Sequence, residues 1–99
     1  MASISLGRSF SEGDIVRHFK RELATPDELA SEPKLHMYKI IAFAKHTETS
    51  ELLVIYRALY GQCETFARPA NMFMSEVDRT MYPEVKQQYR LEKVEEEAV

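Results

Sequence analysis

Apolar and polar side chains alternate along several short stretches of this chain, a pattern typical of β-strands with one buried face. These stretches are rich in Tyr, Ile, Val and Phe, and turn-forming residues separate them. The clearest pair surrounds the polar turn Glu48-Thr49-Ser50 and predicts a β-hairpin. In all, the pattern predicts strands over residues 13–20, 37–46, 51–61, 65–68 and 89–94.

The length of the hairpin loop decides which side chains share a face of the sheet. With Glu48-Thr49-Ser50 as a three-residue loop, Ile40 shares a face with Tyr56. With a two- or four-residue loop, the shared face would instead carry Ile55. We favour the three-residue loop, which requires a left-handed backbone at Ser50.

Helix signals are confined to short segments. Thr25 followed by Pro26 and Glu28 has the pattern of a capping box with proline in the first turn, and predicts a helix over 26–31. The helix must be short, because Pro33 disfavours helical geometry in the residue before it. Single helical turns are predicted over 71–76 and 82–86.

The elements together predict a mainly β fold, a small SH3-like antiparallel barrel of about five strands with short helical turns. Near-closure into a barrel would remove most exposed strand edges. The expected organisation is a loose arm over 1–12, one domain over 13–94 that contains an inserted loop at 21–36, and an acidic tail over 95–99.

Composition narrows the class of protein. The chain has 99 residues, of which 44% are hydrophobic and 29% charged, as in a globular domain. The single cysteine, Cys63, cannot form an internal disulfide, and no apolar run approaches the roughly 20 residues that span a bilayer. We therefore expect a cytoplasmic protein with no membrane contact. The net charge of −3 argues against a general phosphate-binding surface.

Several of these segments, in this order and spacing, resemble a bacterial family known only as domain of unknown function 1653. They are His18-Phe19-Lys20, 44–49 with Glu51, 54–61, Arg68-Pro69 and Met72-Phe73, and the likeness extends over about 13–77. The family commonly has a shorter link after His-Phe-Lys and glycine at the position of Ser50. The resemblance implies a small β-rich domain similar to SH3-like barrels, and it implies no reaction.

The hairpin turn concentrates candidate chemistry in His46, Glu48 and Glu51, and His18 could approach if the first strand pairs nearby. Imidazoles and carboxylates could bind a metal or act as general bases. The competing interpretation is a structural turn in which His46 donates to the backbone, and it is preferred because the ligand spacing is scattered. We expect no metal, no cofactor and no catalytic residue. Cys63 has no neighbouring base to activate it.

A second candidate site consists of aromatic residues beside an arginine, which in small barrels can grip an extended peptide or stacked bases. Most of these aromatics are expected to pack in the core, and Arg68 could instead clamp Glu48 or Glu51. The set is Tyr38, Tyr56, Tyr60, Phe66 and Arg68. RNA binding would need a stripe formed by Arg17, Lys20, Arg21, Lys39, Lys45 and Arg57.

The function predicted from the sequence is a non-enzymatic domain that binds a protein or peptide. The alternative is an enzyme, or enzyme subunit, that binds a small molecule or metal at the hairpin turn, and RNA binding is a third hypothesis. The candidate ligand-binding residues are His18, His46, Glu48, Glu51, Tyr56, Tyr60 and Arg68.

Overall fold

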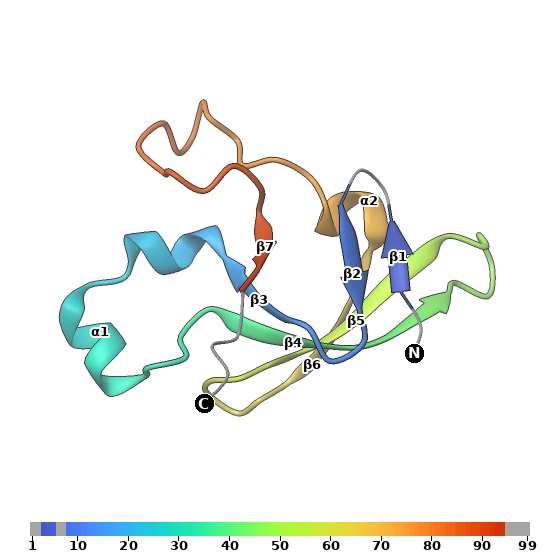
Figure 1. Cartoon of the computed structure of the whole chain (residues 1–99), viewed down its shortest axis with the longest axis horizontal. Coiled ribbons are helices and arrows are strands. Elements are labelled where there is room, and N and C mark those ends of the chain that lie inside the picture. The colour runs from blue at the N-terminus through green and yellow to red at the C-terminus, as the bar shows by residue number, and fades with distance from the viewer. Residues whose placement is uncertain (1–2, 6–7, 95–99) are drawn as a thin grey trace.

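The computed structural model describes residues 3–5 and 8–94 (Figure 1). Its main element is an antiparallel sheet with the order β6-β5-β4-β3-β7. The strands are β3 (Ile15–His18), β4 (Met37–Lys45), β5 (Leu52–Ala58), β6 (Thr65–Pro69) and β7 (Leu91–Lys93). All five predicted strands are present, and the mainly β fold is confirmed.

The sheet is not closed into a barrel. Strands β6 and β7 form its two edges and do not pair with each other. β7 has only three residues, so one side of the sheet offers little backbone for closure. The expected barrel is therefore corrected to an open, five-stranded sheet, and none of the described strands covers the outer edge of β6.

The structure describes residues 3–5 and 8–12 of the loose arm expected over 1–12, and two strands are present there, whereas the acidic tail expected over 95–99 lies outside the described residues. β1 (Ser3–Ser5) and β2 (Ser9–Ser11) form a separate antiparallel hairpin. Phe10 is 1% exposed and packs edge-on against Phe73 of α2 (Ala70–Phe73). Arg8 donates to the backbone oxygens of Leu91 and Met74. The sequence pattern did not predict β2, because it is rich in serine and only one of its residues, Phe10, is a buried aromatic.

The main core lies between the sheet and the layer formed by the β1–β2 hairpin and α2, which lie together in Figure 1. Fully buried side chains from the sheet contribute its centre, and burying each stabilises the fold by about 1.5–3 kcal/mol. The buried members are Phe10, Val16, Ile40, Val54, Tyr56, Ala70, Phe73, Met74 and Leu91.

The β4–β5 pairing contains a bulge that the sequence analysis did not foresee. Near the turn, Lys45 pairs with Leu52, which is the register of a four-residue loop, so the three-residue loop is wrong. The register shifts between Ile40 and Ala42, and beyond the shift Ile40 pairs with Tyr56, so these two side chains share a face as expected. Ser50 has the predicted left-handed backbone, with φ of 61°.

The insertion carries two short helices. α1 (Pro26–Ser31) has the predicted bounds, and both bonds of the capping box between Thr25 and Glu28 are formed. The 3₁₀ helix η1 (Phe19–Leu23), which was not predicted, begins directly after β3. It joins the insertion to the sheet at the position where the candidate site lies.

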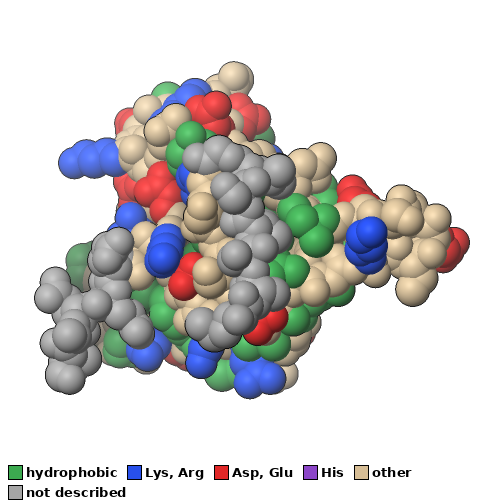
Figure 2. Space-filling model, turned by 45° about the vertical axis from the view of Figure 1, so that its right-hand side comes forward, with side chains coloured by type: hydrophobic (Ala, Val, Ile, Leu, Met, Phe, Trp, Pro, Cys, Tyr) green, Lys and Arg blue, Asp and Glu red, His purple; other side chains and the backbone are tan. Residues whose placement is uncertain are grey.

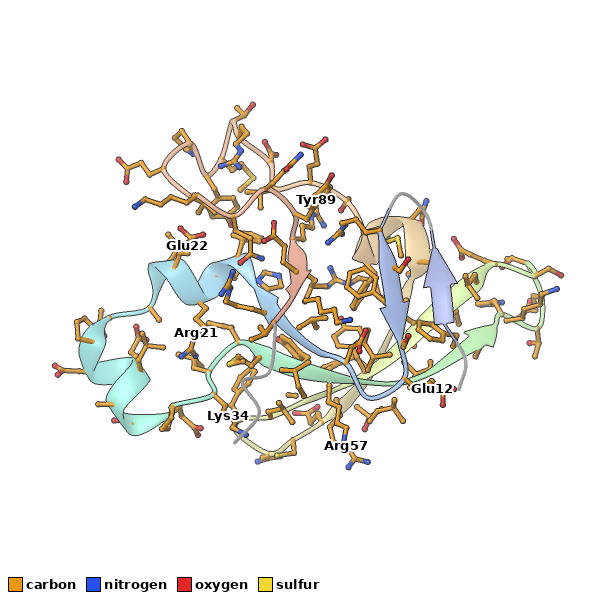
Figure 3. All side chains as sticks on the ribbon, viewed as in Figure 1. Glu12, Arg21, Glu22, Lys34, Arg57 and Tyr89 are labelled. Carbon is orange, nitrogen blue, oxygen red and sulfur yellow. The ribbon has the colours of Figure 1, made fainter. Side chains whose placement is uncertain are left out.

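The segment between α2 and β7 has no regular helix, so the helical turn expected over 82–86 is absent and the one over 71–76 is the shorter α2. Side chains hold this segment in place. Glu22 accepts hydrogen bonds from the backbone of Lys86 and Gln87, and Figure 3 shows Glu22 on the side of η1 that faces this segment. Phe19, Val77 and Val85 form a second buried cluster beneath it.

Candidate functional site

A cleft with basic and aromatic walls lies where η1, the middle strands and the 78–90 segment meet. It consists of two adjoining cavities of about 250 Å³ each, which share His18, Lys20 and Arg68. We call it the basic cleft. The first cavity is completed by Phe19, Asp78, Met81, Tyr82 and Arg90, and the second by His36, Tyr38, Tyr56 and Tyr60.

Local backbone structure fixes His18 at the junction of the two cavities. His18 ends β3, where it pairs with Leu91, and its N–H donates to the carbonyl of His36 over 2.9 Å. The Nδ1 atom of its imidazole accepts from the backbone N–H of Lys20 at 3.1 Å and caps η1. This bond positions Lys20 beside the imidazole.

His18 is held in its neutral form. Burial lowers the pKa of His18 to about 4, followed by repulsion from protonated His36 and from the cations Lys20, Arg68 and Arg90. Since Nδ1 is an acceptor, the neutral ring carries its proton on Nε2, which leaves one N–H donor for a ligand. The same charges that keep His18 neutral would attract an anion into the cleft.

Positive charge exceeds negative charge in the basic cleft. Lys20, Arg68 and Arg90 line it, and within residues 3–5 and 8–94 no carboxylate oxygen lies at ion-pairing distance from any of them. Asp78 is the one acidic lining residue, and its Oδ1 already accepts from the backbone N–H groups of Thr80 and Met81. The cations are therefore available to an acidic ligand.

Tyrosines form the other wall and divide between core and surface. Tyr56 is 5% exposed and packs against Phe73, so it is mainly a core residue whose edge reaches the cleft. Tyr38 and Tyr60 are half-buried, and their hydroxyl oxygens lie 2.7 Å apart. Burial and this hydrogen bond raise the pKa of Tyr38, so it stays protonated. Phe66 extends the aromatic surface from β6.

The structure thus brings together four of the seven residues predicted as a site: His18, Tyr56, Tyr60 and Arg68. The aromatic set of the sequence analysis also lies together, since Tyr38 contacts Tyr56, Tyr60 and Phe66. Arg68 lies in the basic cleft, and the described residues show no ion pair between it and Glu48 or Glu51.

The hairpin turn is a separate place. Figure 1 shows the loop between β4 and β5 at the opposite end of the sheet from η1, so His18 does not approach His46. His46 accepts at Nδ1 from the backbone N–H groups of Glu48 and Thr49, which corrects the expectation that it donates to the turn. Glu48 and Glu51 are exposed. In Figure 2 this end of the molecule stands out from the body.

The described residues of this turn form no metal-type cluster. Across the part of the chain that the structure describes, no three His, Cys, Asp and Glu side chains are grouped so that they could hold a metal ion. Cys63 is exposed in the turn between β5 and β6.

None of the described helices is long and apolar enough to cross a membrane.

The six cations considered for RNA do not form one stripe. Lys20 lines the basic cleft, whereas Arg17 and Arg21 line a different hollow beside Leu29. Lys39 and Arg57 are cross-strand neighbours on the sheet, and Figure 3 shows Arg57 on the side away from the 78–90 segment. Lys45 lies at the hairpin end of β4.

Sequence reasoning missed several lining residues, chiefly His36, Asp78, Tyr82 and Arg90. His36 has a left-handed backbone, φ 61°, at the entry to β4, and no glycine marks that position. Arg90 reaches the cleft only because the 78–90 segment folds back onto η1. A usable signal existed for Lys20, which follows His18 and Phe19 in one of the segments that carry the family resemblance.

Comparison with known proteins identifies the family of this chain and gives no reaction or ligand. The model of a family described as "Protein of unknown function (DUF1653)" matches residues 14–93, which is most of the chain and more than the 13–77 that carried the resemblance. No curated protein and no solved structure matches the chain. On this match, the chain belongs to the DUF1653 family of proteins of unknown function.

Proposed function

We propose that this protein is a non-enzymatic binding domain that holds an acidic segment of a partner protein in the basic cleft. The observation that carries the proposal is the uncompensated charge of Lys20, Arg68 and Arg90, which line one small cavity around a neutral imidazole. An arginine can donate two parallel hydrogen bonds to a carboxylate, and such charge-assisted bonds are stronger than neutral ones.

The walls of the cleft suit recognition of a peptide. Tyr60, Tyr82 and Phe66 offer ring surface that is not fully buried, and aromatic side chains bury much area with little loss of conformational entropy. Small β-domains commonly bind extended peptides in aromatic grooves of this kind. The proposal goes with the expectation of a bacterial, cytoplasmic protein, which rests on the family resemblance and the single cysteine.

Binding is favoured over catalysis by what the lining residues can do. None of the described residues that line the cleft is a serine, threonine or cysteine, so no hydroxyl or thiol nucleophile of those types faces His18. The Nδ1 atom of His18 is used by the backbone of Lys20, and Asp78 is used by its own turn. Both side chains therefore stabilise the local backbone.

The experiment is calorimetric titration with a ten-residue peptide of alternating Glu and Val, called here the Glu-Val peptide. Arg68→Glu should weaken its binding by about 10- to 100-fold, because a hydrogen bond to a charged group contributes about 1.5–3 kcal/mol. The matched control is Lys39→Glu, which makes the same charge change at an exposed position of β4 that does not line the cleft. It should bind within about twofold of the wild type.

Two further titrations, and the comparison of the two variants, decide between partner classes. A Lys-Val peptide of the same length should not bind. The other ligand is a single-stranded RNA decamer. If the RNA binds, Arg68→Glu weakens that binding and the Glu-Val peptide does not bind, the proposal is contradicted and RNA is favoured as the ligand. Equal loss of peptide affinity in Arg68→Glu and Lys39→Glu would contradict it too, since the effect would then be one of net charge alone.

A further inference from the structure

The outer edge of β6, which pairs with none of the described strands, lies directly beside the basic cleft. β6 is the terminal strand of the sheet, and Thr65, Phe66 and Ala67 are exposed. An uncovered edge strand presents unpaired backbone groups to solvent and is a template for an added strand. Arg68, on the same strand, lines both cavities of the cleft.

The pairing of β6 with β5 shows which backbone groups are free. The N–H of Ala58 donates to the carbonyl of Glu64, so these two residues form a hydrogen-bonded pair. Hydrogen-bonded and non-hydrogen-bonded pairs alternate in an antiparallel ladder. Phe66 and Arg68 therefore face β5 with their backbone groups, whereas Thr65 and Ala67 direct theirs away from the sheet. Pro69 has no N–H and ends the donor row.

Side-chain direction links this edge to the cleft. Phe66 and Arg68 are two residues apart, so they point to the same face of the sheet. That face is the one with the cleft, because Phe66 contacts Tyr38 and Tyr56, and Arg68 lines both cavities. A strand added beside β6 would place every second side chain next to Phe66 and Arg68.

We propose that the acidic segment binds as an added β-strand on β6, with its backbone paired to Thr65 and Ala67 and a carboxylate held by Arg68. This inference rests on the proposed function and specifies how the same site engages its ligand. The ligand class is an extended peptide with acidic side chains at alternate positions. Peptide recognition by strand addition gains affinity from main-chain hydrogen bonds and specificity from alternate side chains.

A second copy of this chain fits the edge less well than an acidic peptide does. In a symmetric pairing, the strand that a second copy would bring is β6 itself, whose sequence Thr-Phe-Ala-Arg-Pro carries a cation and no carboxylate. The other edge strand, β7, has Glu92, whose Oε2 already accepts from the backbone N–H groups of Gln88 and Tyr89. A second copy would leave Lys20, Arg68 and Arg90 without acidic partners. Charge complementarity therefore selects a partner with carboxylates.

The test on the protein side uses Ala67→Pro, with Ala67→Val as the matched control. Proline removes the outward N–H of residue 67 and leaves the β5 ladder intact, because that N–H takes no part in it. We expect Ala67→Pro to weaken binding of the Glu-Val peptide at least tenfold, and Ala67→Val to bind within about twofold of the wild type. Binding of Ala67→Pro at wild-type affinity would overturn the inference.

The test on the ligand side keeps the protein unchanged, so it decides even if Ala67→Pro does not fold. Two versions of the Glu-Val peptide are N-methylated, one on every Glu and the other on every Val. A Glu that lies opposite Arg68 shares its face and directs its own amide away from β6, so the Val amides are the ones that point toward β6. The version methylated on Val should therefore lose at least tenfold in affinity, and the version methylated on Glu should be close to the parent peptide; the reverse order would overturn the inference. Equal affinity of the two versions, whether retained or lost, would overturn the inference.

The outcomes separate the two proposals. If the unmodified peptide does not bind the wild type, the proposed function fails and the strand addition fails with it. If the peptide binds and Arg68→Glu abolishes binding, while Ala67→Pro and both methylated peptides behave as their parents, the proposed function stands and strand addition is wrong. A dimer of the free protein that Ala67→Pro dissociates would make a second copy the occupant and overturn the inference.

Discussion

The hairpin turn and the basic cleft contain similar residue types and use them in different ways. At the turn, His46, Glu48 and Glu51 are close in sequence, and the imidazole is used by the backbone of its own loop. In the cleft, His18 and Arg68 are fifty positions apart in sequence and line one cavity. The polar residues of the turn form hydrogen bonds with the backbone of the same turn. The cations of the cleft come from distant segments of the chain, and they remain available to a ligand.

The largest expected effect concerns the 78–90 segment, which forms one wall of the cleft. It tests whether hydrogen bonds to residues far away in the sequence hold this segment in place. Gln87 is 5% exposed, and its Nε2 donates to the backbone oxygens of Arg17 and Tyr89 while its Oε1 accepts from the Arg17 guanidinium. Gln87→Leu should lower the free energy of unfolding by about 2–4 kcal/mol, since several buried polar groups lose their partner.

The control for this prediction is Gln88→Leu, an exposed neighbour that should change the free energy of unfolding by less than about 0.5 kcal/mol. Urea denaturation followed by circular dichroism measures both variants. Similar values for the two would show that the 78–90 segment is not anchored through Gln87. The contrast between the distantly built cleft and the locally built turn would then weaken.

The next effect is a dependence of stability on pH that originates in the cleft. The pKa of His18 is about 4 in the folded chain and near 6.5 when unfolded, so the unfolded state binds the proton first as the pH falls. The free energy of unfolding should therefore fall between pH 6.5 and 4. Because His18 is partly solvated, we expect a loss of about 1–2 kcal/mol.

His18→Asn isolates this contribution, because asparagine can still cap η1 through its side-chain oxygen. The variant should show a shallower decrease over the same pH range. A residual slope is expected from His36, whose pKa burial also lowers. An unchanged slope in the variant, measured by urea denaturation at several pH values, would show that His18 is not the group that titrates.

The smallest effect belongs to the hairpin turn. His46→Ala removes the acceptor for the N–H groups of Glu48 and Thr49, and should cost about 0.5–1 kcal/mol of stability. Lys45→Ala removes an exposed side chain and should cost almost nothing. Thermal midpoints compare the two. Neither variant should alter binding of the Glu-Val peptide, and a loss of binding in His46→Ala would return the turn to the list of candidate sites.

How far the sequence predicted the molecule depended on the range of the interactions involved. α1 was predicted to the residue because proline, cap and capping-box partner lie within four positions. The left-handed backbone at Ser50 was predicted from the turn alone. The register of β4 and β5 was predicted only in part, because no glycine or proline signals the bulge at Ile41.

The cleft was also predicted only in part, because some of its residues are brought together by contacts between segments far apart in the sequence. The strand pattern could suggest that Tyr56, Tyr60 and Arg68 lie near one another, and Arg90 carried no such pattern. Arg90 joins the site through a segment without regular structure, whose path depends on Glu22, Gln87 and buried contacts of Phe19. Contacts of this kind leave no periodic signal in the sequence.

The most direct measurement of the central claim is a backbone and side-chain NMR titration of the full chain with the Glu-Val peptide. We expect shift changes at Thr65, Ala67 and the Arg68 guanidinium, together with the His18 ring, and no changes over 46–51. Changes confined to the hairpin turn, with His18 and Arg68 unaffected, would contradict the account.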